Sequence, residues 1–238
     1  SNYNVGIGNY SMDAALNGAL NNTALGHYTL SSLTEGDSNV AIGYNAGGSL
    51  TTGGTNILIG RNAGSSGTDL AYSVIIGTYA GDAINTNNSQ GSVLIGYEAG
   101  TNLTDGVNSL IGYYAGRYLS TQGYNTMYGF EVGQYMNGSS NTFIGYYAGR
   151  GSSTSAPYGN GGNNVALGRE ALKAISSGSY NVAIGRDSLK IATDGDHNIA
   201  LGYSSGVALT SGDDNVLIGN NTAINLSTGT NNIAIGEN

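Results

Sequence analysis

The sequence contains no cysteine and no tryptophan, one proline (Pro157), two histidines and only seven lysine and arginine residues among 238. Without cysteine, disulfides and thiol chemistry are excluded. Seven basic residues spread along a chain of net charge −8 form no basic surface, so nucleic acid is not an expected partner. No apolar run approaches the roughly 20 residues of a membrane helix, and residues 1–4 do not begin a signal peptide, so membrane insertion is not expected.

Glycine is abundant, with 41 residues, and many of the glycines belong to an internal repeat. A five-residue phrase recurs: Asn, a β-branched or small residue, an apolar residue, Ile or Leu, and Gly. Clear copies lie at 39–43, 181–185 and 232–236. We call the closing glycine of each copy the anchor. There are fourteen anchors, mostly seventeen positions apart: Gly8, Gly26, Gly43, Gly60, Gly77, Gly96, Gly112, Gly129, Gly145, Gly168, Gly185, Gly202, Gly219 and Gly236.

The residues before each anchor predict a short strand. β-Branched residues favour extended backbone, and apolar side chains on both faces are typical of buried parallel strands. The unit between two anchors is too short for a βαβ crossover or a propeller blade. We therefore predict an all-β fold, a parallel β-solenoid or β-roll of about 14 coils, as a single array over 1–238 with an insertion loop at 151–162. Each coil is expected to add a shorter second strand near the apolar residue seven positions after the anchor.

Asparagine begins the phrase in twelve of its fourteen copies. Asparagine tolerates turn conformations, and stacked asparagine side chains can form hydrogen-bonded ladders. We predict a structural turn ladder along the solenoid, which includes Asn39, Asn56, Asn181, Asn198 and Asn215.

The phrase and its continuation resemble known repeats. Asn-Val-Ala-Ile-Gly followed by Tyr-Asn-Ala-Gly, at 39–47, is similar to the head repeats of trimeric autotransporter adhesins and to repeats in phage tail fibres. The adhesin heads are left-handed parallel β-rolls in which three chains pack side by side. The units here are longer than those of adhesin heads, and the additional residues follow the anchor phrase, which favours the phage-fibre branch.

The resemblance implies a structural and adhesive fibre segment: a phage tail-fibre shaft or receptor-binding region that mediates host-cell attachment. The alternative is the head domain of a bacterial trimeric surface adhesin. Either would be extracellular, on a virion tail fibre or a bacterial cell surface. The doubly apolar strand favours self-association independently, because one face can fill the coil while the other meets a partner chain. We expect a homotrimer or an end-to-end filament, with a cell-surface glycan or receptor as a further possible partner.

Residues suited to catalysis or metal binding are scarce. His27 and His197 are ten repeats apart and cannot share a site within one chain, and the repeated glycines lack the lysine of a phosphate loop. Acidic turns at 194–196 and 212–214 could offer oxygen ligands to calcium, but solvated turn carboxylates are the simpler interpretation. We expect no enzymatic activity, no metal and no cofactor.

Aromatic residues concentrate in one region of the repeat. Nine of the 18 tyrosines lie between 113 and 158. Exposed tyrosine rings are rigid, amphipathic surfaces suited to sugars or proteins, although they can equally form stabilising cross-strand ladders. As a hypothesis, a receptor- or glycan-contact patch comprises Tyr113, Tyr114, Arg117, Tyr118, Tyr146, Tyr147, Arg150 and Tyr158.

A column of small polar residues lies eight positions after the anchor. It includes Thr34, Thr51, Thr68, Thr193 and Thr210. Regular threonine arrays on flat solenoids suggest an ice-binding β-solenoid as a third function. The column mixes Thr, Ser and Asn and is one residue wide, so a solvated polar face is the better interpretation.

Overall fold

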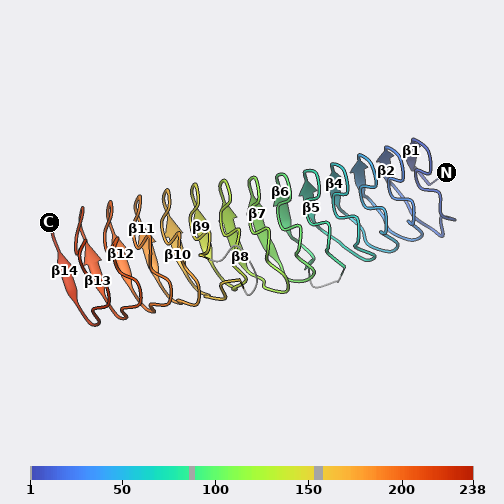
Figure 1. Ribbon diagram of the computed structural model, residues 1–238. Helices are drawn as coiled ribbons and strands as arrows, with labels where there is room; N and C mark the ends of the chain where they lie inside the picture. The colour runs from blue at the N-terminus through green and yellow to red at the C-terminus, as the bar shows by residue number, and fades with distance from the viewer. Residues whose placement is uncertain (1, 86–88, 153–157, 238) are drawn as a thin grey trace. The chain divides into compact units, whose positions relative to one another are not determined.

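The computed structural model describes residues 2–85, 89–152 and 158–237. The chain divides into two compact units, Ser1–Gly123 and Tyr124–Asn238. Each contains seven short strands among the described residues (Figure 1). In the first unit they are β1 (Val5–Ile7), β2 (Thr23–Leu25), β3 (Val40–Ile42), β4 (Ile57–Ile59), β5 (Val74–Ile76), β6 (Val93–Ile95) and β7 (Asn108–Ile111). In the second they are β8 (Asn125–Tyr128), β9 (Thr142–Ile144), β10 (Val165–Leu167), β11 (Val182–Ile184), β12 (Ile199–Leu201), β13 (Val216–Ile218) and β14 (Ile233–Ile235).

Within each unit, every strand pairs in parallel with the next one along the chain. Val40 of β3 lies opposite Ile57 of β4, and Val182 of β11 lies opposite Ile199 of β12, so equivalent positions of the repeat stack on each other. The prediction of an all-β parallel solenoid, in which each coil is one copy of the repeat, is confirmed.

The interior of each coil is filled by one face of the strand and by the apolar residue that follows the turn. The middle strand residue, such as Leu58 or Ala183, is fully buried, and so are Leu50 and Leu209 at seven positions after the anchor. Burial of these small sets of side chains in every coil is the main stabilising contribution.

In two coils, the interior side chains at two positions have complementary sizes. In the coil of β11, the small Ala183 in the strand accompanies the large Leu189, four residues after the anchor. In the coil of β4, the large Leu58 accompanies Gly64 at that same position. A Cβ atom built on Gly64 would lie 3.1 Å from Leu58 Cδ2 and 3.2 Å from Ile75 Cδ1, so a large residue in both positions would overfill the core.

The expected second strand is absent from the described residues. Thr34 and Thr51 still donate backbone hydrogen bonds to the next coil, from Thr34 N to Thr51 O at 3.0 Å and from Thr51 N to Thr68 O at 2.7 Å. The chain around them is not extended, because the residues two and four positions after the anchor adopt left-handed angles, as Tyr28 (φ 57°) and Leu30 (φ 49°) do. Two such residues keep the backbone turning, and the prediction of a second strand was wrong.

The outer face of the sheet is apolar and accessible in the single chain. Ile199 of β12 is 38% exposed, and Ile184 of β11 is 39% exposed. The strand is therefore buried on one face only, although both of its faces are apolar.

Asparagines at the start of the phrase form a chain of buried hydrogen bonds. Asn181 Nδ2 donates to Asn164 Oδ1 at 3.1 Å and to Gly195 O at 2.7 Å. Asn39 and Asn56 repeat this arrangement in the first unit, where Asn56 Nδ2 donates to Asn39 Oδ1 at 2.9 Å. Asn198 and Asn215 continue it in the second unit, at 2.9 Å. Each side chain thus links its own coil to both neighbours.

The insertion loop predicted at 151–162 is described at 151–152 and 158–162. Gly159 forms an isolated parallel bridge with Met136, and Asn137 N donates to Gly159 O at 2.5 Å. The end of the insertion is therefore joined to the neighbouring coil by backbone hydrogen bonds. Pro157 and residues 153–156 lie outside the described residues.

Candidate functional site: an aromatic turn and an acidic trough

Each anchor glycine is followed by two residues that we call the aromatic turn. The second of these residues has a left-handed backbone in coil after coil, with φ 58° at Tyr114 and 58° at Tyr147. Both residues present their side chains at the coil edge, where rings from the same and adjacent coils meet. Eight residues were predicted to form a contact patch; four of them lie in each unit, and each set is described by itself.

In the first unit, Tyr113 and Tyr114 have ring centroids 4.1 Å apart, and Tyr113 stacks on Tyr97 of the preceding coil at 5.4 Å. The Arg117 guanidinium lies 4.3 Å from the ring centroid of Tyr114 and 5.1 Å from that of Tyr118. Arg117 is also ion-paired with Glu98 at 2.7 Å. Tyr114 and Tyr118 thus lie against one guanidinium, and Tyr113 joins the cluster through Tyr114.

The second unit repeats this arrangement. Tyr146 and Tyr147 have ring centroids 4.0 Å apart, and the Arg150 guanidinium lies 4.7 Å from the ring of Tyr147 and is ion-paired with Glu131 at 2.8 Å. Tyr158 reaches this cluster through Tyr135, whose ring is 6.2 Å from that of Tyr158 and 4.9 Å from the Arg150 guanidinium. Rings and guanidinium groups stack on one another, as expected of a stabilising ladder, while Tyr113 and Tyr146 remain exposed.

The aromatic turn contains phenols that stay protonated at neutral pH. The side-chain hydrogen bond with Tyr146, followed by burial, raises the pKa of Tyr147 to about 12. The corresponding bond with Tyr113 raises the pKa of Tyr114. Neither phenol can act as a general base near pH 7, so these residues offer ring surfaces and hydroxyl groups rather than acid–base chemistry.

The charged residues follow the repeat in a way that the sequence interpretation missed. All seven lysines and arginines lie one or five positions after an anchor. Eight acidic residues lie nine to twelve positions after an anchor, where no basic residue occurs: Glu35, Asp37, Asp69, Asp105, Asp194, Asp196, Asp213 and Asp214. The coil therefore has one mixed edge and one acidic edge, a division that is visible once the anchors are aligned.

On the mixed edge of the second unit, Glu170 joins three basic side chains. Its carboxylate lies 3.2 Å from Lys173 Nζ, 2.8 Å from Lys190 Nζ and 3.3 Å from Arg169 Nη2. The hydrogen bond from Lys190 is the main reason that the pKa of Glu170 falls to about 2. Lys190 also pairs with Asp187 at 3.1 Å, so these charges form a connected network.

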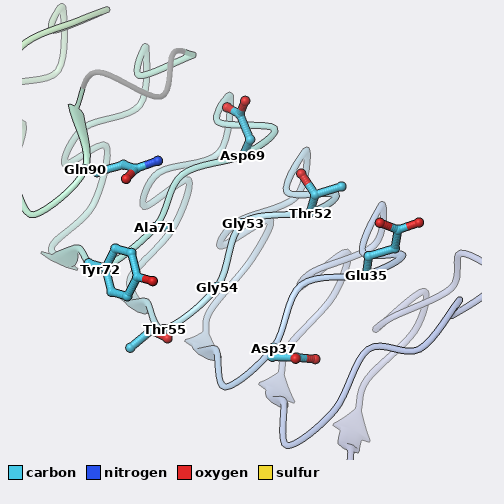
Figure 2. A pocket seen from close by; sticks show the side chains of 10 residues that line it. All are labelled: Glu35, Asp37, Thr52, Gly53, Gly54, Thr55, Asp69, Ala71, Tyr72 and Gln90. Atoms are coloured by element: carbon cyan, nitrogen blue, oxygen red, sulfur yellow. The ribbon is translucent and has the colours of Figure 1, made fainter.

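On the acidic edge of the first unit lies an open trough of about 610 Å³ (Figure 2). Glu35, Thr52 and Asp69 stand in a row along one side, and Asp37, Thr55 and Tyr72 stand along the other. Gly53 and Gly54 lie between the rows, and Gln90 and Ala71 complete the lining. The sequence interpretation did not identify any residue of this trough.

The two histidines and the acidic turns have local partners. His27 packs against Tyr28, with ring centroids 4.1 Å apart, and His197 stacks on Tyr180 at 5.0 Å. In the acidic turns, Asp196 Oδ1 accepts a hydrogen bond from Ser179 N at 2.7 Å, and Asp213 Oδ1 accepts one from Asp196 N at 2.9 Å. Within the described residues, no three His, Asp or Glu side chains are grouped so that they could hold a metal ion.

No family model, curated protein or solved structure matches the chain. In the part of the chain that the structure describes, no helix has the length and apolar character needed to cross a membrane. The function must therefore be argued from the solenoid, its surfaces and the repeat phrase.

Proposed function

We propose that the chain is a structural and adhesive segment of an extracellular fibre that associates with copies of itself and attaches to cells. The observation that carries the proposal is the accessible apolar face of the sheet, which recurs in strand after strand. Ile57, Ile144, Ile184 and Ile199 are large apolar residues on this face, and each is exposed in the single chain. Exposed apolar residues on neighbouring strands, as at Ile184 and Ile199, are typical of a protein interface.

A second copy of the chain is the occupant that fits this face best. The face repeats with the coil, and an identical chain presents the same repeat and can match it along its length. Both faces of the strand would then be buried, as is usual for parallel sheets. The likeness of the phrase to adhesin-head repeats favours three chains, so we propose a homotrimer.

The mass of the protein in solution tests this part of the proposal. Light scattering coupled to size-exclusion chromatography should give three times the 24.1 kDa of one chain. A monomer at micromolar concentration would contradict the proposed association.

The adhesive part of the proposal rests on the aromatic turn and on the repeat phrase. The lengthened units favour a phage tail-fibre shaft or receptor-binding region over the head of a bacterial adhesin. Binding of the labelled protein to a panel of bacterial cells tests this role directly. A phage fibre should discriminate among bacterial strains, and a bacterial adhesin should bind host tissue instead.

The ice-binding alternative is less well supported by the threonine column. Thr51 Oγ1 donates to Thr68 O at 2.7 Å, and Thr210 Oγ1 donates to Ser227 O at 3.0 Å, so these hydroxyls are used between coils. A thermal-hysteresis measurement at high protein concentration separates this function from adhesion.

A further inference from the structure

In several coils, the position six residues before the anchor closes a hydrogen bond between coils. The backbone N–H at this position donates to the side chain at the same position of the following coil. Leu20 N donates to Asp37 Oδ1 at 2.7 Å in the first unit. In the second unit, Ser179 N donates to Asp196 Oδ1 at 2.7 Å, and Asp196 N to Asp213 Oδ1 at 2.9 Å. We call this position the capping column.

The capping column lacks an acceptor side chain in the two consecutive coils that follow Asp37, as it also does at Leu20, Gly106 and Gly123 of the first unit. After Asp37, the next members of the column are Gly54 and Ala71, and neither has a side chain that can accept a hydrogen bond. A Cβ atom on Gly54 would lie 2.8 Å from Asp37 O and 3.3 Å from Asp37 N, so a side chain here would press against the Asp37 backbone. Among the described residues, Asp37 N and Gly54 N accordingly have no acceptor within the chain.

The trough lies where the capping column has no acceptor side chain, at Gly54 and Ala71. Gly53 and Gly54 lie between its two rows of side chains, and Asp37 and Gly54, whose N–H groups have no acceptor within the described chain, both line it. Glu35, Asp37 and Asp69 place carboxylates along its two sides, and Asp37 Oδ1 already accepts the hydrogen bond from Leu20 N. The trough thus combines donors and acceptors in adjacent coils, in a volume typical of ligand sites.

Tyr72 adds an aromatic surface at one side of the trough. Its side chain is 67% exposed, and its backbone is held in the left-handed region at φ 57°. Thr52, Thr55 and Gln90 add hydroxyl and amide groups, and no lysine or arginine lines the trough. A ring beside polar groups of both kinds suits a ligand with one apolar face and many hydroxyls.

We propose that the trough binds an uncharged pyranose oligosaccharide, with Asp37 N and Gly54 N donating to its oxygens and the carboxylates accepting from its hydroxyls. A hydroxyl both donates and accepts, so one sugar ring satisfies both sets of groups. Its apolar face packs on Tyr72. Sialic or uronic acids are disfavoured, because three carboxylates would repel them without a compensating cation. The site deepens the adhesive part of the proposed function and rests on it for its biological role.

The decisive variant is Gly54→Asp. Aspartate occupies this column at Asp37, Asp196 and Asp213, and Gly54 does not adopt a positive φ. A Cβ atom at Gly54 would lie 2.8 Å from Asp37 O, so the backbone must shift slightly for the new carboxylate to cap Asp37 N. The new side chain also fills part of the trough. Tyr72→Ala removes the ring, and Tyr180→Ala is its matched control, because Tyr180 is the equivalent residue of a coil in the second unit, 55% exposed at φ 61°.

Titration calorimetry on the full chain would use neutral oligosaccharides of glucose, galactose, mannose and N-acetylglucosamine, with sialic acid and glucuronic acid oligomers for comparison. We expect at least one neutral oligosaccharide to bind wild type and Tyr180→Ala equally. Binding to Gly54→Asp and Tyr72→Ala should be weaker by about tenfold or more. If Gly54→Asp does not fold, Tyr72→Ala decides the question, since its side chain is largely in solvent.

The proposal is overturned if no neutral oligosaccharide binds, if both variants bind as well as wild type, or if the acidic oligomers bind more tightly. These measurements need neither cells nor a particular oligomeric state. If the protein attaches to cells but its trough variants bind oligosaccharides as well as wild type does, the trough site is refuted and the fibre function stands. A protein that binds oligosaccharides at the trough but attaches to no cell would refute the adhesive function instead.

Discussion

Asn181 Oδ1 accepts two hydrogen bonds from Asn198, one from its backbone N at 2.9 Å and one from its side-chain Nδ2 at 3.0 Å. Both residues are fully buried. One amide oxygen therefore fixes the register of two coils, and no water is needed to satisfy either partner.

Asn181→Ala should destabilise the protein by about 2–4 kcal/mol, because it leaves Asn198 N and Gly195 O without a buried partner and removes one of the bonds made by Asn198 Nδ2. Urea denaturation would measure the change. Asn220→Ala, at an exposed position of the same unit, is the control and should change stability by less than about 0.5 kcal/mol. Equal effects of the two substitutions would contradict a structural role for the ladder.

Leu189→Gly should destabilise the protein by about 2–4 kcal/mol, since the loss of a buried side chain outweighs relief of its left-handed backbone at φ 47°. Adding Ala183→Leu should recover part of that loss, because the new side chain would extend into the space left by Leu189, as the Leu58 side chain does beside Gly64. Ala183→Leu alone should destabilise by overpacking. A double-mutant cycle that shows no coupling energy between positions 183 and 189 would refute the idea that the sizes of these two side chains compensate each other.

Glu170→Gln should lower stability at pH 7 by about 1–2 kcal/mol, since Lys173 and Lys190 lose a charged partner. The pKa of Glu170 is lowered from 4.5 to about 2 in the folded protein, so its stabilisation is complete above about pH 4.5 and is lost as the pH falls through about 2. Denaturation curves of the two proteins should therefore converge towards pH 2. A difference that stays constant from pH 7 to pH 2 would exclude the charge as its cause.

Replacing both Ile184 and Ile199 with Lys on the outer sheet face should convert the proposed trimer into monomers, because each chain would present two charges to its neighbour. Ile191→Lys is the matched control: Ile191 is 41% exposed but lies outside the strands. The control should keep the wild-type mass in light scattering. An unchanged mass in the double variant would place the interface elsewhere.

Tyr114→Ser with Tyr147→Ser tests the predicted aromatic patch, since both rings contact the guanidinium of their own cluster. If these rings contact a receptor, cell attachment should fall by about tenfold or more while the circular dichroism spectrum of the protein stays unchanged. Lower thermal stability with unchanged attachment would assign these rings to a ladder within the fold.

The repeat allowed the strand positions, the parallel register and the asparagine column to be predicted, because each depends on residue types that recur at fixed spacing. The second strand was predicted wrongly, since the sequence does not show that a bulky residue such as Leu30 takes a left-handed backbone. The residues of the aromatic turn could be found by counting tyrosines. The trough could not be found in this way, because it depends on the absence of a side chain at Gly54. That absence has meaning only once the hydrogen bond from Leu20 N to Asp37 Oδ1 shows what a side chain at this position does.

The stacking of coils in register has a genetic consequence. Between β10 and β14, successive anchors keep one constant spacing, and each coil offers the next the same hydrogen-bonding edge. Recombination between neighbouring repeats that removes or duplicates one whole unit would leave every remaining contact between coils with an equivalent partner. The gene can therefore change the length of the protein in steps of one coil.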